Sequence, residues 1–212
     1  MIYTIHNHPQ RSPEWFASRL GRVTGSRCAD VFAQIKSGEA AARRDYRMQL
    51  VLERLTGKPQ DDPYINADMQ RGIDLEPLAR SAYEARTGNL VREVGFLAHT
   101  ELMAGCSSDG LCERGIIEIK CPRSAAHVET LKSQALPSRY RPQVMHNLWI
   151  SGADWCDFVS YDDRLPVGLQ LVVVRVERDP QIIEKHAAAV ADFLGEVDAE
   201  YMAVLALQEK AA

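Results

Sequence analysis

Apolar residues recur every three to four positions through much of the first part of the chain, which is the spacing of amphipathic helices. Ser12 followed by Pro13 is a typical helix start, because serine caps the first free amides and proline tolerates the first helical position. Gly57 and Gly88 each follow a periodic stretch and are predicted to end it. The spacing predicts helices over residues 12–21, 24–36, 39–56 and 69–87. The predicted apolar faces of the second and third helices comprise Cys28, Val31, Phe32, Ile35, Met48, Val51, Leu52 and Leu55.

The apolar period changes after residue 88, where short stretches rich in β-branched and aromatic residues begin. They predict strands at residues 89–99, 101–107, 115–121, 154–161 and 169–177. Helical spacing returns at residues 124–132 and 138–151, and from Pro180 to near the end of the chain. This order predicts an α/β fold of the mixed α+β type, with helices flanking a central mixed sheet. The stripe of the last helix comprises Val190, Phe193, Leu194, Val197, Tyr201, Val204 and Leu205.

The length of 212 residues suits one domain, and no internal repeat or low-complexity segment divides the chain. The most loop-like stretch, residues 57–64, is too short for a domain linker, so residues 1–212 are predicted to form a single domain. No apolar run approaches the roughly 20 residues that cross a bilayer, and the N-terminus lacks a signal-peptide pattern. We therefore expect a cytoplasmic protein without a membrane partner.

Five cysteines are present, and none form CxxC pairs. Zinc or an iron–sulfur cluster would need closer ligand pairs, so we expect reduced thiols, with Cys106 and Cys121 packed as small apolar residues. The net charge of −4 does not indicate a nucleic-acid-binding protein, although a groove can be basic locally. Arginines cluster within residues 11–27, 43–47 and 139–141, where a solvated helix face is the alternative interpretation.

Two acids and a lysine lie in the stretch SSDGLCERGIIEIKCP, residues 107–122. Because alternate side chains of a strand share a face, Glu118 and Lys120 point one way and Ile117, Ile119 and Cys121 the other. A hairpin after Asp109 would return the chain beside it and bring both carboxylates to one ammonium. Carboxylates suit Mg²⁺, which can activate water for attack on a phosphoryl group. A solvated strand face with an incidental Glu–Lys pair is the alternative.

Glu76 lies near the apolar stripe of the predicted helix 69–87, where a carboxylate is costly unless it is paired or binds a metal. A helix-capping or surface glutamate is the alternative. Met69, at the start of that helix, can be a first-turn core contact.

Several motifs together resemble one nuclease family. The RG…LEP helix, the CSSDGL turn, the EIKCP strand and the later YRPQVMHNLWISG segment are similar to the phage lambda exonuclease type. This type is the YqaJ-like viral recombinase branch of the PD-(D/E)XK nuclease superfamily, and the similarity covers nearly the whole chain. It implies a restriction-endonuclease-like core. It also implies metal ligation by Glu76, Asp109, Glu118 and the Ile119 carbonyl, and assistance to the attacking water by Lys120.

The same resemblance implies a pocket for the terminal 5′-phosphate of DNA. Arg19 can hold a phosphate bidentately, and Ser26 lies near a helix N-terminus that favours anions, although ordinary capping by Thr24 or Ser26 explains the segment as well. Met145 replaces a glutamine that family members favour there. Met69 falls where the lambda-type enzyme places an apolar wedge between base pairs. The residues implied in this pocket and its surroundings are Arg19, Ser26, Ser107, Tyr140 and Gln143.

We therefore expect a Mg²⁺-dependent 5′→3′ exonuclease that digests one strand of linear double-stranded DNA from 5′-phosphorylated ends. It would release mononucleotides and leave a 3′ overhang for recombination. Two Mg²⁺ ions are implied, with Mn²⁺ as a possible substitute. The resemblance also implies a ring-shaped homotrimer, a phage-type single-strand annealing partner and a phage or prophage origin in a bacterial cell. A sequence-specific endonuclease on the same core and a DNA-binding module that does not cut are the alternatives.

Overall fold

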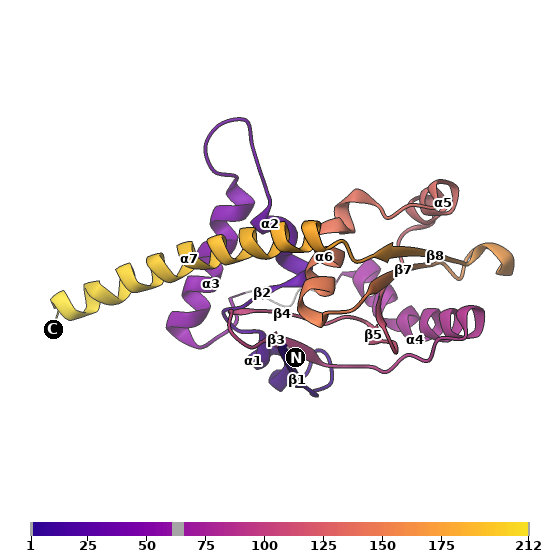
Figure 1. The fold of residues 1–212 in the computed structure, drawn as a ribbon, viewed down its shortest axis with the longest axis horizontal. Coiled ribbons are helices and arrows are strands. Elements are labelled where there is room, and N and C mark those ends of the chain that lie inside the picture. Colours follow the sequence, from indigo (N-terminus) through magenta and orange to yellow (C-terminus); the bar gives the residue numbers. More distant parts are fainter. Residues whose placement is uncertain (1, 61–65, 212) are drawn as a thin grey trace.

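The computed structural model describes residues 2–60 and 66–211, with helices packed around two β-sheets (Figure 1). The helices are α1 Pro13–Arg19, α2 Cys28–Val31, α3 Ala41–Thr56, α4 Ala67–Thr87, α5 Ser124–Ser133, α6 Arg141–Ser151 and α7 Pro180–Ala211. Short 3-10 segments are η1 Gly25–Arg27, η2 Ser138–Tyr140 and η3 Val167–Leu169. The strands are β1 Tyr3–His6, β2 Val23–Thr24, β3 Phe96–His99, β4 Ala104–Cys106, β5 Gly110–Leu111, β6 Gly115–Lys120, β7 Trp155–Tyr161 and β8 Leu171–Glu177. Residues 61–64 of the predicted loop at 57–64 lie outside the described residues.

Both sheets are mixed, which confirms the predicted fold class. One has the strand order β1-β3-β4-β2 and the other β5-β6-β7-β8. The pairs β2–β4 and β6–β7 are parallel, and the remaining pairs are antiparallel. The predicted strand 89–99 is shortened to β3, because the chain at Arg92 instead bridges Leu111. The short strand β1, with Tyr3 and Ile5 as its apolar residues, was not predicted.

The hairpin that joins β5 to β6 brings Asp109 back beside the second strand, as predicted. Gly110 pairs with Ile117 and Leu111 with Ile116 in the antiparallel register. The Asp109 amide donates to the Ile117 carbonyl at 3.1 Å. Asp109 is thereby fixed at the end of the sheet where Glu118 and Lys120 emerge.

The predicted helix boundaries hold where capping residues define them. The Trp15 amide donates to the Ser12 hydroxyl at 3.2 Å, so Ser12 caps α1. Gly57 and Gly88 both adopt left-handed φ angles at the ends of α3 and α4. The helix predicted over residues 24–36 is wrong in length, because i→i−3 hydrogen bonds close α2 at Val31. Ile35 lies beyond that end and is 57% exposed.

Two predicted helix faces need correction. In α3 the buried residues are Tyr46, Leu50, Val51 and Glu53, whereas Met48 and Leu52 are exposed. The buried face of α3 is the one that packs on α2 and α7, and it does not coincide with the most apolar residues of the helix. In α7 the stripe is buried through Val197, but Val204 is exposed because the helix extends past the rest of the molecule (Figure 1).

Two apolar clusters hold the sheets and helices together. The larger one combines residues of both sheets with α3, α6 and α7. The smaller one packs Leu75, Ala79 and Tyr83 of α4 against Ile117 and Ile119 of β6. Helices α4 and α5 lie on opposite sides of the second sheet (Figure 1). This packing places Glu76, next to Leu75, at the edge of β6.

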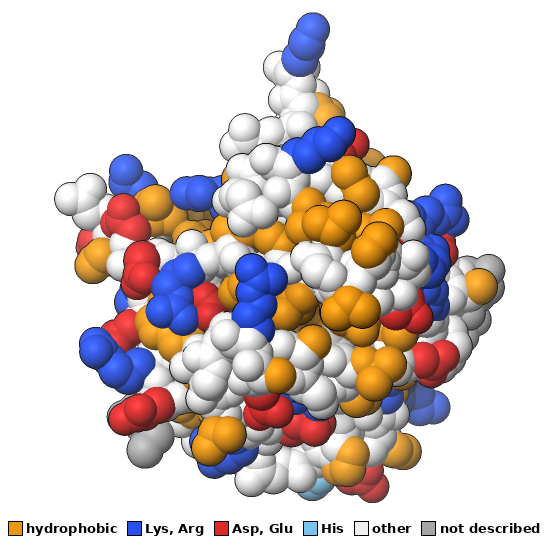
Figure 2. Space-filling view, turned by 90° about the vertical axis from the view of Figure 1, so that its right-hand side faces the viewer, with side chains coloured by type: hydrophobic (Ala, Val, Ile, Leu, Met, Phe, Trp, Pro, Cys, Tyr) orange, Lys and Arg blue, Asp and Glu red, His pale blue; other side chains and the backbone are white. Residues whose placement is uncertain are grey.

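Within the described residues, no helix combines the length and apolarity needed to cross a membrane. On the face drawn in Figure 2, basic side chains are scattered among acidic and hydrophobic ones rather than joined in a strip.

Candidate active site

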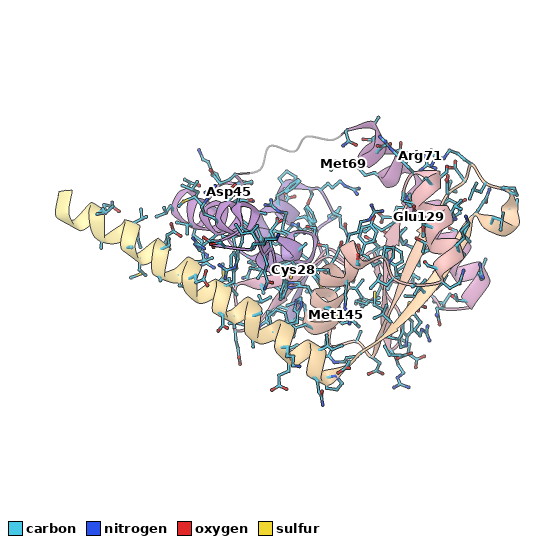
Figure 3. The ribbon with its side chains drawn as sticks, turned by 90° about the horizontal axis from the view of Figure 1, so that it is seen from above. Cys28, Asp45, Met69, Arg71, Glu129 and Met145 are labelled. Atoms are coloured by element: carbon cyan, nitrogen blue, oxygen red, sulfur yellow. The ribbon has the colours of Figure 1, made fainter. Side chains whose placement is uncertain are left out.

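A cleft of about 1080 Å³ opens between α4, the end of β6 and the N-terminal segment. It contains most of the residues that the sequence predicted for catalysis and for the duplex wedge. Met69 lies at the N-terminal end of α4, which carries the cleft wall (Figure 3). The predicted residues that line the cleft are Met69, Glu76, Asp109, Ile119, Lys120 and Tyr140.

Asp109, Glu118 and Lys120 meet at the end of the β5–β6 hairpin. The Ile119 amide donates to Asp109 Oδ2 at 2.6 Å, which fixes the Asp109 carboxylate across the hairpin. Lys120 Nζ donates to Glu118 Oε1 at 2.5 Å, as expected for two side chains on one strand face. Glu118 is 1% exposed, so it lies behind the cleft surface that Lys120 lines.

Helix α6 supplies two further donors to Glu118. Gln143 Nε2 donates to Glu118 Oε1 at 2.5 Å, and Asn147 Nδ2 donates to Oε2 at 2.8 Å. Gln143, which the resemblance placed in the phosphate pocket, thus contacts the strand glutamate. Asn147 was missed by the sequence reasoning. Its spacing of four residues from Gln143 puts the two on one helix face, a signal that could have found it.

Glu76 faces the cleft from α4 and is held by arginines. Arg80 Nη2 donates to Glu76 Oε1 at 2.7 Å, and Arg11 Nη2 lies 3.9 Å from Oε2. Arg80 also pairs with Glu93 at 2.7 Å. The Glu76 side chain is 20% exposed, so the alternative of a simple surface glutamate does not describe it.

The pKa values of all three acids are raised, chiefly by burial. Burial raises the pKa of Glu118 to about 7, and the charges of Asp109 and Glu76 add to this despite Lys120. Burial also raises the pKa of Asp109, and burial together with Asp109 raises that of Glu76. Burial alone would lower the pKa of Lys120, but Glu118 and Asp109 outweigh it and raise the value. Lys120 therefore stays protonated.

Repulsion among buried acids is the condition that a bound cation relieves. The donors at the cleft are carboxylate oxygens, which hard ions such as Mg²⁺ prefer, so the residues fit such an ion. The three acids are not drawn together tightly: within the described residues, the one set of three ligand atoms within 4.8 Å of each other belongs to Cys28, His146 and His186. Metal ligation by Glu76, Asp109, Glu118 and the Ile119 carbonyl stays a prediction.

Three of the residues predicted for the phosphate pocket form a cluster beside the cleft. Arg19 donates from Nη1 to Ser107 Oγ and from Nη2 to Ser26 Oγ, both at 3.4 Å. The Trp15 ring lies under the guanidinium at 4.0 Å, and Trp15 Nε1 donates to Ser107 Oγ at 2.9 Å. Trp15 was not predicted as a site residue. The cluster thus combines the Arg19 guanidinium with the hydroxyls of Ser26 and Ser107, and the Trp15 ring packs against the guanidinium.

The remaining predicted residues lie at the cleft wall. Tyr140 packs against Phe158 with ring centroids 5.2 Å apart, and Lys120 Nζ is 5.4 Å from the Tyr140 ring centroid. Met69 is 52% exposed, so the alternative of a first-turn core contact is wrong. Its exposure leaves the wedge role open as a prediction.

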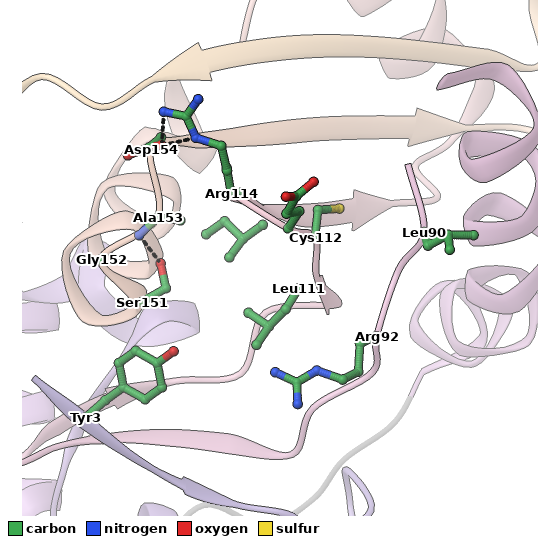
Figure 4. Close-up of a pocket in the computed structure, with 13 residues that line it drawn as sticks. Tyr3, Leu90, Arg92, Leu111, Cys112, Arg114, Ser151, Gly152, Ala153 and Asp154 are labelled. Carbon is green, nitrogen blue, oxygen red and sulfur yellow. Dashed lines mark hydrogen bonds and ion pairs between the residues drawn. The ribbon is translucent and has the colours of Figure 1, made fainter. Parts of the chain in front are cut away.

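A second pocket lies elsewhere on the molecule and contains none of the predicted site residues (Figure 4). Its volume is about 580 Å³. Arg114 and Asp154 form an ion pair at its edge at 2.6 Å, and the Ala153 amide donates to Ser151 Oγ at 3.3 Å. The acids and the lysine therefore distinguish the first cleft as the candidate active site.

Comparison with known proteins bears on this cleft. The model of the YqaJ-like viral recombinase domain matches residues 14–154, which include all four predicted catalytic residues. The chain belongs to this family. The comparison with curated proteins found no match.

Solved structures agree with the YqaJ-like assignment. An alkaline exonuclease, LHK-Exo from Laribacter hongkongensis, is 43% identical over 95% of this chain and 100% of its own, with a TM-score of 0.86. LHK-Exo in complex with dAMP gives a TM-score of 0.87 at the same identity and coverage. A phage related exonuclease from Haemophilus somnus 129PT shares the fold, with a TM-score of 0.65 at 16% identity over 86% of this chain and 96% of its own.

Proposed function

We propose that the protein is a metal-dependent deoxyribonuclease that digests one strand of linear double-stranded DNA in the 5′→3′ direction. It would start at 5′-phosphorylated ends, release mononucleotides and leave a 3′ overhang for recombination. The observation that carries the proposal is the convergence of Glu76, Asp109 and Lys120 on one cleft, with Glu118 behind them. The 43% identity to an alkaline exonuclease that binds dAMP supports it, since dAMP is the kind of product such a reaction releases.

In this proposal the acids hold Mg²⁺, with Mn²⁺ as a possible substitute and two ions in the complete site. The ligands would be Glu76, Asp109, Glu118 and the Ile119 carbonyl. Bound Mg²⁺ supplies positive charge that activates water and stabilises a phosphoryl group under attack. The Ile119 amide keeps Asp109 in place, and Gln143 and Asn147 orient Glu118.

Lys120 contributes a proton donor and a positive charge rather than a base. Its pKa is raised by Glu118 and Asp109, so it stays an ammonium. From the cleft wall it can orient the attacking water and donate a hydrogen bond to a phosphate oxygen as negative charge develops. Removal of a proton from water is left to the other groups of the site.

The Arg19 cluster, made of Arg19, Ser26 and Ser107, would explain why the enzyme requires a 5′-phosphorylated DNA end. Arg19 and the hydroxyls of Ser26 and Ser107 form a set of donors suited to the extra charge of a terminal phosphate. Gln143 and Tyr140 would extend this polar wall toward the scissile bond. Met69, exposed at the mouth, would separate the terminal base pair so that one strand enters the cleft.

A comparison of DNA ends tests the proposal. Linear duplexes with 5′-phosphate or 5′-hydroxyl ends are incubated with Mg²⁺, and released mononucleotides are measured over time. We expect a clear preference for the phosphorylated end, and we expect Arg19→Ala to abolish the preference. Arg44→Ala, which changes an exposed arginine of α3, is the matched control. Equal rates on both ends with the unchanged chain would overturn the phosphate pocket.

Other substrates separate this activity from its alternatives. Cutting of closed circular DNA into discrete fragments would identify a sequence-specific endonuclease. DNA binding without hydrolysis in Mg²⁺ or Mn²⁺ would identify a module that does not cut. The proposal also includes a homotrimer and an annealing-protein partner in a bacterial cytoplasm, as the resemblance implies, and light scattering should then give three times the chain mass.

A further inference from the structure

A second group of potential metal ligands lies outside the cleft. Cys28 at the start of α2, His146 within α6 and His186 in the first turns of α7 meet in the larger apolar cluster. All three are buried, and His186 is the most exposed of them at 6%. Cys28 and Met145, the neighbour of His146 in the chain, both lie beside α7 (Figure 3). The three residues come from distant parts of the sequence, so no spacing motif indicated them.

Two of the separations between the ligand atoms match a tetrahedral metal site. His146 Nδ1 lies 3.3 Å from His186 Nε2, and Cys28 Sγ lies 3.5 Å from the same nitrogen. Zinc bonds of usual length at tetrahedral angles would hold two nitrogens about 3.3 Å apart and a nitrogen and a sulfur about 3.6 Å apart. These two separations thus fit a shared tetrahedral cation.

The surroundings of His146 select the tautomer that a ligand needs. Its Nε2 lies 3.1 Å from the Gly105 carbonyl, which can only accept, so Nε2 carries the proton. The lone pair is then on Nδ1, facing His186 and Cys28. Metal-binding histidines usually donate their second nitrogen to a carbonyl or carboxylate in this way. Burial also lowers the pKa values of His146 and His186, to about 3 and about 4, so both imidazoles are neutral.

We propose that Cys28, His146 and His186 bind one Zn²⁺ ion, with a fourth position left for a small ligand. Binding replaces the S–H bond of Cys28 with a zinc–sulfur bond and releases the proton to solvent, while no electron is transferred. A thiolate and two imidazoles are a soft donor set that favours zinc over magnesium. This site is therefore chemically distinct from the oxygen donors of the cleft, and it does not depend on the proposed function.

The ion would fasten the C-terminal helix to the elements that carry the candidate active site. His146 lies between Gln143 and Asn147 on α6, the two residues that hold Glu118. Cys28 follows directly on η1, which contains Ser26. Zinc would accordingly stabilise the fold at the junction of α2, α6 and α7, and its removal would loosen the helix behind Glu118.

Metal content and a cobalt spectrum test the site. The chain, purified without a histidine tag, is equilibrated with Zn²⁺, passed through a desalting column and analysed by atomic emission. We expect about one zinc per chain, and at least about a tenfold loss of zinc affinity in Cys28→Ser and in His186→Gln. With Co²⁺ in place of zinc, the unchanged chain should show thiolate-to-cobalt charge-transfer absorption that is absent from Cys28→Ser.

Matched variants and the spectrum separate this site from other sources of bound metal. Cys156→Ser and His127→Gln change a fully buried cysteine and histidine outside the group, and both should retain zinc. Zinc held by the cleft acids would give no sulfur band and would survive Cys28→Ser. A folded, unchanged chain that shows no sulfur band with Co²⁺ would overturn the proposal, as would unchanged zinc content in Cys28→Ser.

Discussion

At the scale of a single residue, Lys120 has two roles. It neutralises Glu118 at 2.5 Å, and it also lines the cleft where a phosphate would enter. An ammonium that stays protonated beside two acids can do both only as a donor and a charge. Its replacement therefore removes transition-state stabilisation and also leaves Glu118 and Asp109 to repel each other.

Lys120→Ala is expected to lower the rate of nucleotide release by about 10²- to 10⁴-fold, the range usual for a lost catalytic donor or charge. The fold should persist, since the side chain lies at the cleft wall rather than in either apolar cluster. Turnover of a phosphorylated duplex and circular dichroism provide the two measurements. Lys132→Ala on α5 is the control, and full activity in Lys120→Ala would contradict the assigned role.

The raised pKa of Glu118 predicts a pH dependence of metal binding. The folded pKa of about 7 exceeds the ordinary 4.5, so the metal-free folded chain takes up a proton more readily than the unfolded chain. The stability that this proton contributes is lost as the pH rises from 4.5 to about 7. A cation, in contrast, binds the ionised form of Glu118. The rise in Tm on adding Mg²⁺ should therefore be larger at about pH 8.5 than at about pH 6.

Differential scanning calorimetry in the presence and absence of Mg²⁺ measures this gain. Glu118→Gln cannot ionise and should show a small gain with little pH dependence. An equal gain at both pH values in the unchanged chain would show that Glu118 is ionised well below neutrality, against the effect of its burial.

Strand periodicity predicted the residues of the site that share a local pattern, and the fold supplied the others. Alternation along β6 was enough to place Glu118 and Lys120 on one face. The contact of Asn147 with Glu118 joins residues 29 positions apart and depends on how α6 docks. Trp15 escaped prediction for the same reason, since its contact with Ser107 joins distant parts of the chain. Arg80 lies four residues after Glu76 on α4, and this spacing could have indicated the pair.

At the scale of elements, η1 passes unusually close to α6. A Cβ on Gly25 would lie 2.3 Å from Asn147 Oδ1, and that side chain is already held by Glu118. Glycine is therefore required for the segment that carries Ser26 to approach the helix that orients the strand glutamate.

Gly25→Ala should displace Asn147 and lower the rate of nucleotide release by about tenfold, the size of a lost orienting hydrogen bond of about 1.4 kcal/mol. Steady-state rates on phosphorylated duplex measure the effect. Gly195→Ala, at an exposed position of α7 with open space around it, should instead raise Tm through about 1 kcal/mol of helix propensity. Normal rates in Gly25→Ala would show that Asn147 has room to yield.

The elements with clear end signals were predicted well, and those without them were not. Glycine ends made α3 and α4 predictable, whereas α2 stops at Val31 without glycine or proline at its end. The buried face of α3 was misjudged because Tyr46 and Glu53 are buried for reasons outside the helix. Tyr46 accepts from the Thr24 amide at 3.1 Å, and Glu53 accepts from the Gly21 amide at 2.8 Å.

At the scale of the whole molecule, the larger cluster joins both sheets to α7 while the smaller cluster supports the cleft. Phe193 of α7 is fully buried in the larger cluster and stacks on Tyr46 with centroids 5.8 Å apart. A substitution of Phe193 therefore tests whether the stability of the fold can be changed without changing the activity of the cleft. The overall layering was predictable from sequence, but the division of strands between two sheets was not, because it is decided by long-range pairing.

Phe193→Ala is expected to lower the free energy of unfolding by about 3–5 kcal/mol, as large-to-small core changes do. At a temperature where the variant stays folded, its preference for 5′-phosphate ends should be unchanged, since Phe193 belongs to the larger apolar cluster, which does not include Arg19, Ser26 or Ser107. Urea denaturation and the end-preference assay measure the two properties. A changed preference would show that the larger cluster shapes the phosphate pocket directly.

The parallel pairing of β6 with β7 has a consequence for synthesis on the ribosome. All four acidic and basic residues proposed for catalysis precede residue 121, but β7, Gln143 and Asn147 are translated afterwards. A parallel partner is reached only through a long crossover, so this part of the sheet closes late. A nascent chain that ends at Lys120 thus carries the chemistry without its support, and we expect it to leave the DNA of its cell intact.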